Sequence, residues 1–485
     1  VDSFECGVTR YASTWFEVDR HYRNALYALN NAGDDPAVKK LIDNIQKDYL
    51  NRYLIKLNDS WQKAVESYSF KSTSLLLQNS FYSKKIKSYT ESSNKIAVII
   101  SDALRYEAGV ELMDAIRRED KYEASVEPMI AMLPSYTQLG MAALLPHSQL
   151  AIDEKAGVFA DKKPTSGLQN RASILSAATG SNAVAFKSED FMAMNRDDIR
   201  VYKRDNDVLY IYHNRIDSVG DKRDTEERVV EAVNDAINDI LAIIKKIASA
   251  DYYSIIVTAD HGFLYQNQPV EETDYIELEK EWAEATFRDR RFVIGKDLPE
   301  HPGMMKKHVS ELGLDGDLEI AFPKSINRLR LQGSGSRYVH GGVSLQEMVI
   351  PVVTINKKRK SDISFVEVDI MQRGSDRITT GQIAVYFYQL DPVSEKVHPR
   401  KFLAGIYSMD DVLLSQEEEL IFDITSNASE DREKRVSFRL TADISMMNNQ
   451  QVLVKLKEKE DDTNYLRVYK TRALFLQVRQ IERDF

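Results

Sequence analysis

The chain has 485 residues, 43% of them apolar and 29% charged, with a formal net charge of −10. The apolar share excludes a disordered chain, and the length predicts about three domains. The single cysteine, Cys6, excludes a disulfide framework and a thiolate zinc site.

The chain opens at Val1 without a methionine, which predicts that it is the C-terminal part of a longer polypeptide. Its apolar runs are far shorter than the ~18 residues that span a bilayer. No basic-then-apolar secretory signal is present either, so we expect a cytoplasmic protein without membrane contact. The acidity lies in residues 93–356, which carry a net charge of −11. It argues against passive, charge-driven binding of nucleic acid.

Residues 1–92 are predicted to be a helical region. Apolar side chains between Val38 and Tyr53 recur at three- and four-residue spacing. Before them, Asp35 is predicted to cap a helix whose first residue is Pro36. No chemistry-bearing pattern occurs here, which indicates a helical domain or connector.

Residues 93–356 are predicted to form an α/β domain with a mostly parallel sheet. The apolar runs Ile96–Ile100 and Ser254–Thr258 are typical of strands buried on both faces. Between them, 226–250 has the apolar spacing of a long helix. Parallel α/β sheets bind their ligands beyond the carboxyl ends of the strands.

Residues 361–485, after a basic linker at 357–360, are predicted to form a β-sandwich that serves as a structural or docking module. Short runs with alternating or continuous apolar residues support this, at 365–370, 382–387, 420–424, 435–440, 452–456 and 471–478.

Two of the predicted strand ends carry polar side chains that could hold a metal ion. Asp260 and His261 follow the second strand, and Asp102 follows the first. Adjacent carboxylate and imidazole ligands suit Zn²⁺ or Mn²⁺. Asp102 is also a common type of turn residue, so either role is open from spacing alone.

Thr137 stands at the start of a small-residue helix, within Pro134–Thr137. One interpretation is a helix cap, in which Ser135 or Thr137 accepts a backbone N–H bond. The other is a nucleophile, because a divalent cation on the hydroxyl would lower its pKa.

Asp217 and Asp221, four residues apart after the strand-like run 208–212, could chelate a second cation or cap the following helix. His340, flanked by glycines, is either a further ligand or an ordinary loop residue.

The order of these pieces resembles the alkaline phosphatase superfamily, and more narrowly the PglZ family of bacterial BREX and phage-growth-limitation defence systems. Four separated motifs in order carry the likeness, over about residues 95–355: 101–107, 133–137, 258–263 and 338–347.

The resemblance implies two divalent cations, Zn²⁺ or Mn²⁺ foremost, with Mg²⁺ as a further option. The first would be held by Asp102, Thr137, Asp260 and His261, and the second by Asp217, Asp221 and His340. Superfamily enzymes usually have a histidine where Asp221 stands. This departure makes the second site more anionic, which favours Mn²⁺ or Mg²⁺ there or weakens its occupancy.

The implied chemistry is attack by Thr137 on phosphorus, with one metal activating the hydroxyl and the other neutralising a phosphoryl oxygen or the leaving group. Arg105 and Arg337 are candidate phosphate clamps, and Arg105 could equally be a salt-bridge partner.

The first functional hypothesis is a metal-dependent phosphodiesterase or nuclease in phage defence, acting on DNA with other BREX proteins as partners. The alternatives are a phosphomonoesterase of the same superfamily and a catalytically degenerate scaffold subunit of the defence complex.

Overall fold

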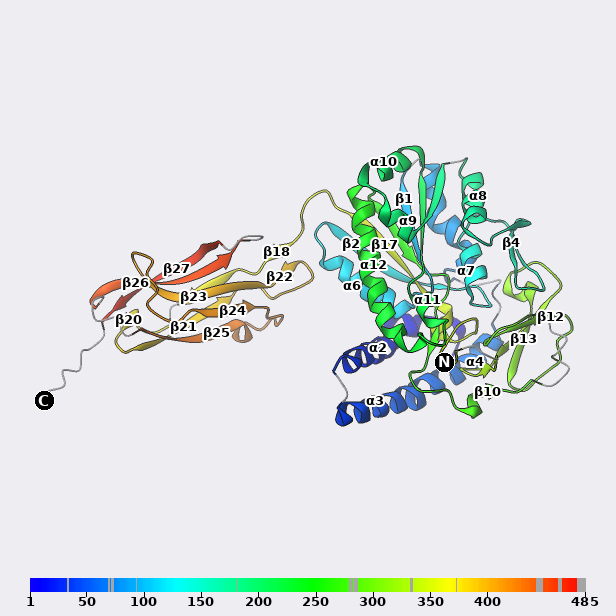
Figure 1. Cartoon of the computed structure of the whole chain (residues 1–485), viewed down its shortest axis with the longest axis horizontal. Coiled ribbons are helices and arrows are strands. Elements are labelled where there is room, and N and C mark those ends of the chain that lie inside the picture. Colours follow the sequence, from blue (N-terminus) through cyan, green and yellow to red (C-terminus); the bar gives the residue numbers. More distant parts are fainter. Residues whose placement is uncertain are drawn as a thin grey trace. The chain divides into compact units, whose positions relative to one another are not determined.

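The computed structural model describes residues 1–485 except 33–34, 69, 71–73, 93, 181, 279–281, 283–286, 332–334, 372, 442–447, 461–464 and 478–485. They form two compact units, Val1–Ile116 with Tyr122–Lys358, and Arg117–Lys121 with Arg359–Phe485 (Figure 1). The division into domains 1–92, 93–356 and 361–485 stays a prediction. In the first unit, the helical region and the sheet contribute to one hydrophobic core.

A six-stranded sheet lies at the centre of the first unit, in the order β2-β17-β8-β1-β7-β6. Strands β8, β1, β7 and β6 pair in parallel, whereas β17 is antiparallel to both of its neighbours. The predicted mostly parallel α/β sheet is therefore confirmed. The strands span Ile96–Ser101 (β1), Tyr122–Ile130 (β2), Ala183–Lys187 (β6), Val208–His213 (β7), Ser254–Thr258 (β8) and Val349–Lys357 (β17).

Strand β1 and its neighbour β8 place the turns that follow them, which carry Asp102 and Asp260, at one edge of the sheet. All six of its residues are buried, as expected for an apolar run between two parallel neighbours. Ile100 is in register with Thr258 of β8. Because the two strands are adjacent and parallel, the turns that follow them meet at the same edge of the sheet.

Helix α12 (Val229–Ser249) runs beside the sheet (Figure 1) and buries an apolar face that includes Ile240, Ile244 and Ile247. None of the described helices is long and apolar enough to cross a membrane. The other helices of this region are α6 (Tyr106–Arg118), α7 (Thr137–Ala143), α8 (Leu168–Ala178), α9 (Ser188–Ala193), α10 (Arg196–Asp205), α11 (Ile216–Gly220) and α13 (Leu345–Met348).

The predicted helical region is confirmed, since most of the described residues before β1 lie in helices. Asp35 caps α3 by accepting a hydrogen bond from Ala37 N at 2.7 Å, and Pro36 is the first helical residue. The helices are α1 (Phe4–Arg10), α2 (Phe16–Asn30), α3 (Pro36–Asp48), α4 (Ile55–Glu66) and α5 (Lys87–Glu91).

Short strands form small sheets around the main one. They are β3 (Leu150–Ile152), β4 (Val158–Ala160), β5 (Lys163–Pro164), β9 (Leu264–Tyr265), β10 (Tyr275–Ile276), β11 (Phe287–Arg288), β12 (Val293–Gly295), β13 (Met304–His308), β14 (Glu319–Pro323), β15 (Arg328–Leu329) and β16 (Tyr338–Val339).

The second unit is a β-sandwich, as predicted. Its two larger sheets have the orders β19-β21-β25 and β20-β27-β26-β23-β24 and share one core, which includes Phe387, Phe402 and Phe422. The strands are β18 (Ser364–Phe365), β19 (Val368–Met371), β20 (Arg377–Ile378), β21 (Gln382–Gln389), β22 (Val397–His398), β23 (Arg400–Ser408), β24 (Glu418–Phe422), β25 (Glu433–Arg439), β26 (Gln450–Lys459) and β27 (Leu466–Leu476).

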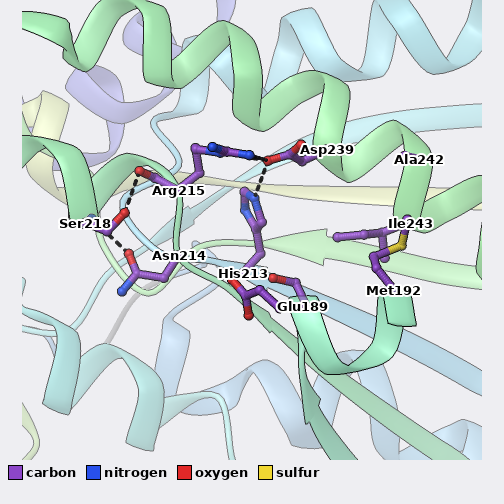
Figure 2. A pocket seen from close by; sticks show the side chains of 10 residues that line it. Glu189, Met192, His213, Asn214, Arg215, Ser218, Asp239, Ala242 and Ile243 are labelled. Carbon is purple, nitrogen blue, oxygen red and sulfur yellow. Dashed lines mark hydrogen bonds and ion pairs between the residues drawn. The ribbon is translucent and has the colours of Figure 1, made fainter. Parts of the chain in front are cut away.

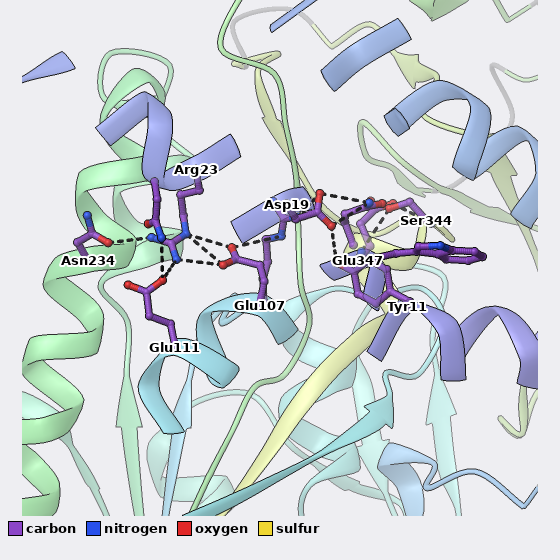
Figure 3. A network of polar contacts seen from close by, with 12 residues as sticks. Tyr11, Asp19, Arg23, Glu107, Glu111, Asn234, Ser344 and Glu347 are labelled. Atoms are coloured by element: carbon purple, nitrogen blue, oxygen red, sulfur yellow. Dashed lines mark hydrogen bonds and ion pairs between the residues drawn. The ribbon is translucent and has the colours of Figure 1, made fainter. Parts of the chain in front are cut away.

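Buried ion pairs join α2 to the start of α6 (Figure 3). Asp19 is fully buried, accepts a hydrogen bond from Tyr11 at 2.7 Å and lies 3.0 Å from the guanidinium of Arg105. One turn later, Arg23 pairs with Glu107 at 3.0 Å. Each buried charge therefore has a partner of opposite sign, which such charges require in order to be tolerated.

We expect Asp19→Asn to destabilise the first unit by about 3–5 kcal/mol, because it removes the nearest anion of the buried Arg105 charge and leaves Glu107 at 4.0 Å. Urea unfolding would measure the loss. Asp48→Asn is the matched control, since Asp48 pairs with Arg52 at the surface, and its cost should stay within about 0.5 kcal/mol. A loss below about 1 kcal/mol for Asp19→Asn would contradict the importance of this ion pair.

Candidate metal centre

The turns after β1 and β8 are joined by the side chain of Asp260. Its Oδ1 accepts hydrogen bonds from the backbone N–H groups of Ala103 at 3.0 Å and His261 at 2.9 Å. Ala103 has a φ of +62°, in the left-handed region that a non-glycine residue seldom occupies. That conformation is stabilised by the bond to Asp260 and brings Asp102 beside the Asp260-His261 pair.

The His261 imidazole is oriented by its own turn. Nδ1 lies 2.9 Å from the carbonyl oxygen of Gly262, and because a carbonyl only accepts, Nδ1 carries the proton. In the neutral ring, the lone pair is therefore on Nε2. This atom lies 3.1 Å from Thr137 Oγ1 and 3.5 Å from both Asp102 Oδ1 and Asp260 Oδ2.

Asp102, Asp260 and His261 form a buried group whose ligand atoms all lie within 4.8 Å of one another. Asp102 Oδ1 and Asp260 Oδ2 are buried and make no hydrogen bond within the described part of the chain. Burying an ionised carboxylate without a hydrogen bond or an opposite charge costs folding free energy, which a bound cation would offset. The donor set, two carboxylates and an imidazole, fits a divalent cation.

Thr137 is the first residue of α7, next to this group. The cap position is occupied by Tyr136, whose side chain makes no capping bond, and Ser135 Oγ instead donates to the carbonyl of Gly342 at 2.7 Å. The helix-cap interpretation of Ser135 or Thr137 is therefore wrong. At Gly140, an added Cβ would lie 2.2 Å from the carbonyl oxygen of Asp260, so α7 packs directly on the turn that carries Asp260.

Asp217, His261 and His340 form a second group of ligand atoms within 4.8 Å of one another. His340 Nε2 lies 3.6 Å from Asp217 Oδ1, and the rings of His340 and His261 stack with centroids 4.2 Å apart. Tyr338 Oη donates to Asp217 Oδ1 at 3.1 Å and so orients that carboxylate. Sequence reasoning missed Tyr338, although it stands two residues before His340.

Asp221 belongs to neither group. Its carboxylate pairs with Arg290, and more than half of its side chain is exposed. Arg290 is buried and also donates to the Tyr338 carbonyl at 3.1 Å. The assignment of Asp221 as a metal ligand stays a prediction, and it would require Asp221 to leave Arg290.

The two arginines predicted to clamp phosphate, Arg105 and Arg337, form ion pairs with other residues. Arg105 is buried against Asp19 and over the ring of Phe263, and Arg337 pairs with Glu227 at 2.7 Å. Arg105 is thus a salt-bridge partner in the interior, and a clamp role for either arginine stays a prediction. Burial raises the pKa of Asp102, and the charge of Arg171 on α8, which sequence reasoning did not identify, opposes that rise.

Burial and like charges shift the pKa values of the cluster. Burial raises the pKa of Asp102 well above its ordinary value, and the Asp260 and Asp217 carboxylates raise it further. Burial also raises the pKa of Asp217, against the lowering effect of His261. The pKa of His340 falls well below its ordinary value through burial and then through the His261 ring. These shifts favour the neutral form of each group. A bound cation would lower the pKa of both carboxyl groups, so that they ionise, and would keep His340 neutral.

A cavity of about 490 Å³ adjoins the segment that carries Asp217 (Figure 2). His213, the last residue of β7, lines it and contacts Ser101 Oγ at 3.0 Å and Asp239 at 3.4 Å. Arg215 donates to the same Asp239 oxygen at 2.8 Å. The cavity therefore lies at the carboxyl end of the parallel strands, where ligands of such sheets bind.

A family model described as the BREX system PglZ alkaline phosphatase-like domain matches residues 81–355. The alkaline phosphatase-like protein PglZ of Bacillus cereus (strain H3081.97) is 32% identical over 439 residues, which are 89% of this chain and 51% of that protein. The alkaline phosphatase-like protein BrxZ of Escherichia coli O9:H4 (strain HS) is 32% identical over 477 residues, 94% of this chain and 54% of that protein. The chain spans about half the length of these curated relatives.

Two solved structures also resemble the chain. Murine ectonucleotide pyrophosphatase/phosphodiesterase 5 matches with 11% identity and a TM-score of 0.38, covering 54% of this chain and 88% of that one. Phosphonoacetate hydrolase from Sinorhizobium meliloti matches with 12% identity and a TM-score of 0.36, covering 54% and 89%. At this similarity, nothing about the substrate follows from either structure.

We expect Asp102→Asn to stabilise the metal-free protein, more at pH 8 than at pH 5. Because the folded-state pKa of Asp102 is raised, its favourable contribution is present below the unfolded pKa of about 3.9 and lost as pH rises through the folded pKa. An asparagine at this position cannot ionise, so Asp102→Asn avoids this loss of folding stability at high pH. Urea unfolding in EDTA at both pH values would measure it.

With Mn²⁺ at about 100 times its dissociation constant, the wild type should gain about 2.7 kcal/mol, and Asp102→Asn much less. Asp197→Asn is the control, since the Asp197 side chain is 89% exposed, and it should leave both quantities unchanged. An equal Mn²⁺ gain in wild type and Asp102→Asn would exclude Asp102 as a ligand.

Proposed function

The chain belongs to the PglZ family, the alkaline phosphatase-like proteins of BREX systems, and on this premise we propose that it is a metal-dependent phosphodiesterase with Thr137 as nucleophile. The observation that carries the proposal is the position of Thr137 Oγ1. It lies 3.1 Å from His261 Nε2, beside two buried carboxylate oxygens that no described residue satisfies. A reactive hydroxyl next to an incomplete ligand set is typical of metal-assisted phosphoryl transfer.

The residues have distinct tasks in this proposal. One cation is held by Asp102, Asp260 and His261 with Thr137, and a second by Asp217, His261 or His340, with Asp221 as a further ligand if it leaves Arg290. When bound, the cations lower the pKa of a hydroxyl and offset charge on phosphoryl oxygens. Thr137 Oγ1 loses its proton to solvent and forms the bond to phosphorus while the bond from phosphorus to the leaving ester oxygen breaks. Water then hydrolyses the phosphothreonine and restores the hydroxyl. Tyr338 holds the Asp217 carboxylate in place, and the Gly262 carbonyl keeps the His261 proton on Nδ1.

The proposal also covers which metals and which substrate the site takes. Carboxylate-rich groups with one or two imidazoles suit Mn²⁺ and Zn²⁺, and Mg²⁺ where oxygen ligands dominate. We propose DNA as the phosphodiester, and other BREX proteins as partners in the cytoplasm, because a defence system acts on phage genomes. The charges of Asp102, Asp217, Asp221 and Asp260 equal those of two divalent cations. Metal loading would thus turn an acidic cluster into one that accepts phosphate.

A second function, a scaffold subunit with a degenerate site, is favoured by one observation. Asp221, at the position where superfamily enzymes usually carry histidine, is paired with Arg290. If that ion pair persists, the second cation has, within the part of the chain that the structure describes, only Asp217, His261 and His340 as ligands, and His261 is shared with the first group.

We expect Thr137→Ala to lower kcat on bis(p-nitrophenyl) phosphate at least about 10³-fold with Mn²⁺ or Zn²⁺, because it removes the nucleophile. Thr137→Ser should retain measurable activity. Thr179→Ala is a matched control, since Thr179 caps the end of α8 by bonding Leu175 O, and it should retain full activity.

Offering supercoiled plasmid, the aryl diester and p-nitrophenyl phosphate side by side separates the substrate classes. Hydrolysis of the monoester alone would overturn the diesterase in favour of a phosphomonoesterase. Phage resistance that survives Thr137→Ala and Asp260→Ala together would overturn the enzyme in favour of the scaffold.

A further inference from the structure

Gln78 is a buried glutamine just outside residues 81–355, the span of the family model. It opens a 3₁₀ turn at Gln78–Ser80 and its side chain is 0% exposed. Its Nε2 donates to the carbonyl oxygens of Ala259 at 3.2 Å and Asp260 at 2.7 Å. Its Oε1 accepts from the backbone N–H of Met132 at 2.9 Å.

The orientation of this amide follows from its partners. Ala259 and Asp260 present carbonyl oxygens, which only accept, and Met132 presents an N–H, which only donates. Both Nε2 hydrogens and Oε1 are therefore used. A carboxylate would repel the two carbonyls, and an apolar side chain would leave three buried backbone groups without partners, each costing about 1–3 kcal/mol.

The two segments that Gln78 connects carry the candidate nucleophile and two of the candidate ligands. Met132 lies five residues before Thr137, and Ala259 and Asp260 immediately precede His261. Both segments leave the sheet at the same edge, but β17 separates β2 from β8 within the sheet. The Gln78 side chain spans this separation beyond the strand ends.

The Asp260 carbonyl is confined by a second contact. Besides Gln78, it touches α7 at Gly140, where an added Cβ would lie 2.2 Å from the carbonyl oxygen. Thr137 begins the same helix. Any shift of the Asp260 carbonyl therefore moves His261 relative to Thr137.

We propose that Gln78 is a positioning residue that sets the spacing between Thr137 Oγ1 and the Asp260-His261 turn. Its amide acts only through backbone groups of the two segments and touches neither a metal ligand atom nor the hydroxyl. An effect of Gln78 on kcat rests on the proposed function, whereas its effect on the stability of the two backbone segments does not.

The test compares Gln78→Leu with Gln62→Leu in the full chain. Gln62 is a matched control, because it is also buried and its amide accepts from a backbone group, Ser325 N at 2.9 Å, outside both segments. Gln78→Asn, which keeps an amide one methylene shorter, serves if Gln78→Leu does not fold.

Three readouts are expected to separate the two variants. Hydrogen exchange should quicken at least tenfold in peptides covering 130–141 and 258–263 for Gln78→Leu only, because the Met132 amide and the ligand turn lose their link. Mn²⁺ affinity should fall tenfold to hundredfold, as for groups that orient metal ligands. On bis(p-nitrophenyl) phosphate, kcat should fall at least tenfold while KM changes less than threefold. Gln62→Leu should leave all three within twofold.

Unchanged exchange in both peptides of a folded Gln78 variant, or equal effects of Gln78→Leu and Gln62→Leu, would overturn the positioning role. A wild type that neither binds Mn²⁺ nor cleaves the diester would overturn the proposed function instead. In that case the exchange measurement alone decides: faster exchange in the two peptides supports the role of Gln78, and unchanged exchange rejects it.

Discussion

Two polar atoms of Asp260 make four contacts on which the geometry of the first unit depends. One carboxylate oxygen accepts from the backbone at Ala103 and His261, which joins the turns after two parallel strands. The carbonyl of the same residue receives Gln78 and meets α7 at Gly140. The second carboxylate oxygen is left free of hydrogen bonds from the described residues. One residue thus holds the framework with two of its polar atoms and offers the third to a ligand.

Two clusters of buried charged residues in this unit differ in how their charges are neutralised. Around α2, Asp19 faces Arg105 and Arg23 faces Glu107, so each charge is neutralised by its neighbour. At the strand ends, carboxylates face carboxylates and a histidine, and burial raises the pKa of Asp102. The first arrangement is neutralised by its own ion pairs, whereas the second groups carboxylates and imidazoles that could hold a metal ion. Perturbed pKa values in such a cluster are a feature of candidate functional sites.

Local patterns predicted the mostly parallel sheet, the β-sandwich and the cap at Asp35, because burial and capping leave periodic or positional signals. They also predicted that Asp102 and Asp260 would meet, since adjacent parallel strands end at one edge. The pairing of Asp221 with Arg290 and of Arg105 with Asp19 had no such signal. These partners lie 69 and 86 residues apart in the chain, and only the three-dimensional packing brings them together. Gln78 was missed for the same reason, as a buried amide carries no spacing rule.

The contacts of the first helices with the segment before β17 have a consequence for biosynthesis. Asn58 of α4 donates to Gln346, which follows it by 288 residues, and Gln346 itself donates to Asp19, 327 residues earlier. At roughly 5–20 residues per second, the ribosome adds Gln346 about 15–60 s after Asn58. During that interval the first helices have been synthesised, but the Asn58 amide and the Asp19 carboxylate do not yet have Gln346 as a hydrogen-bond partner. These contacts between the first helices and Gln346 can therefore form only after the late segment has been synthesised.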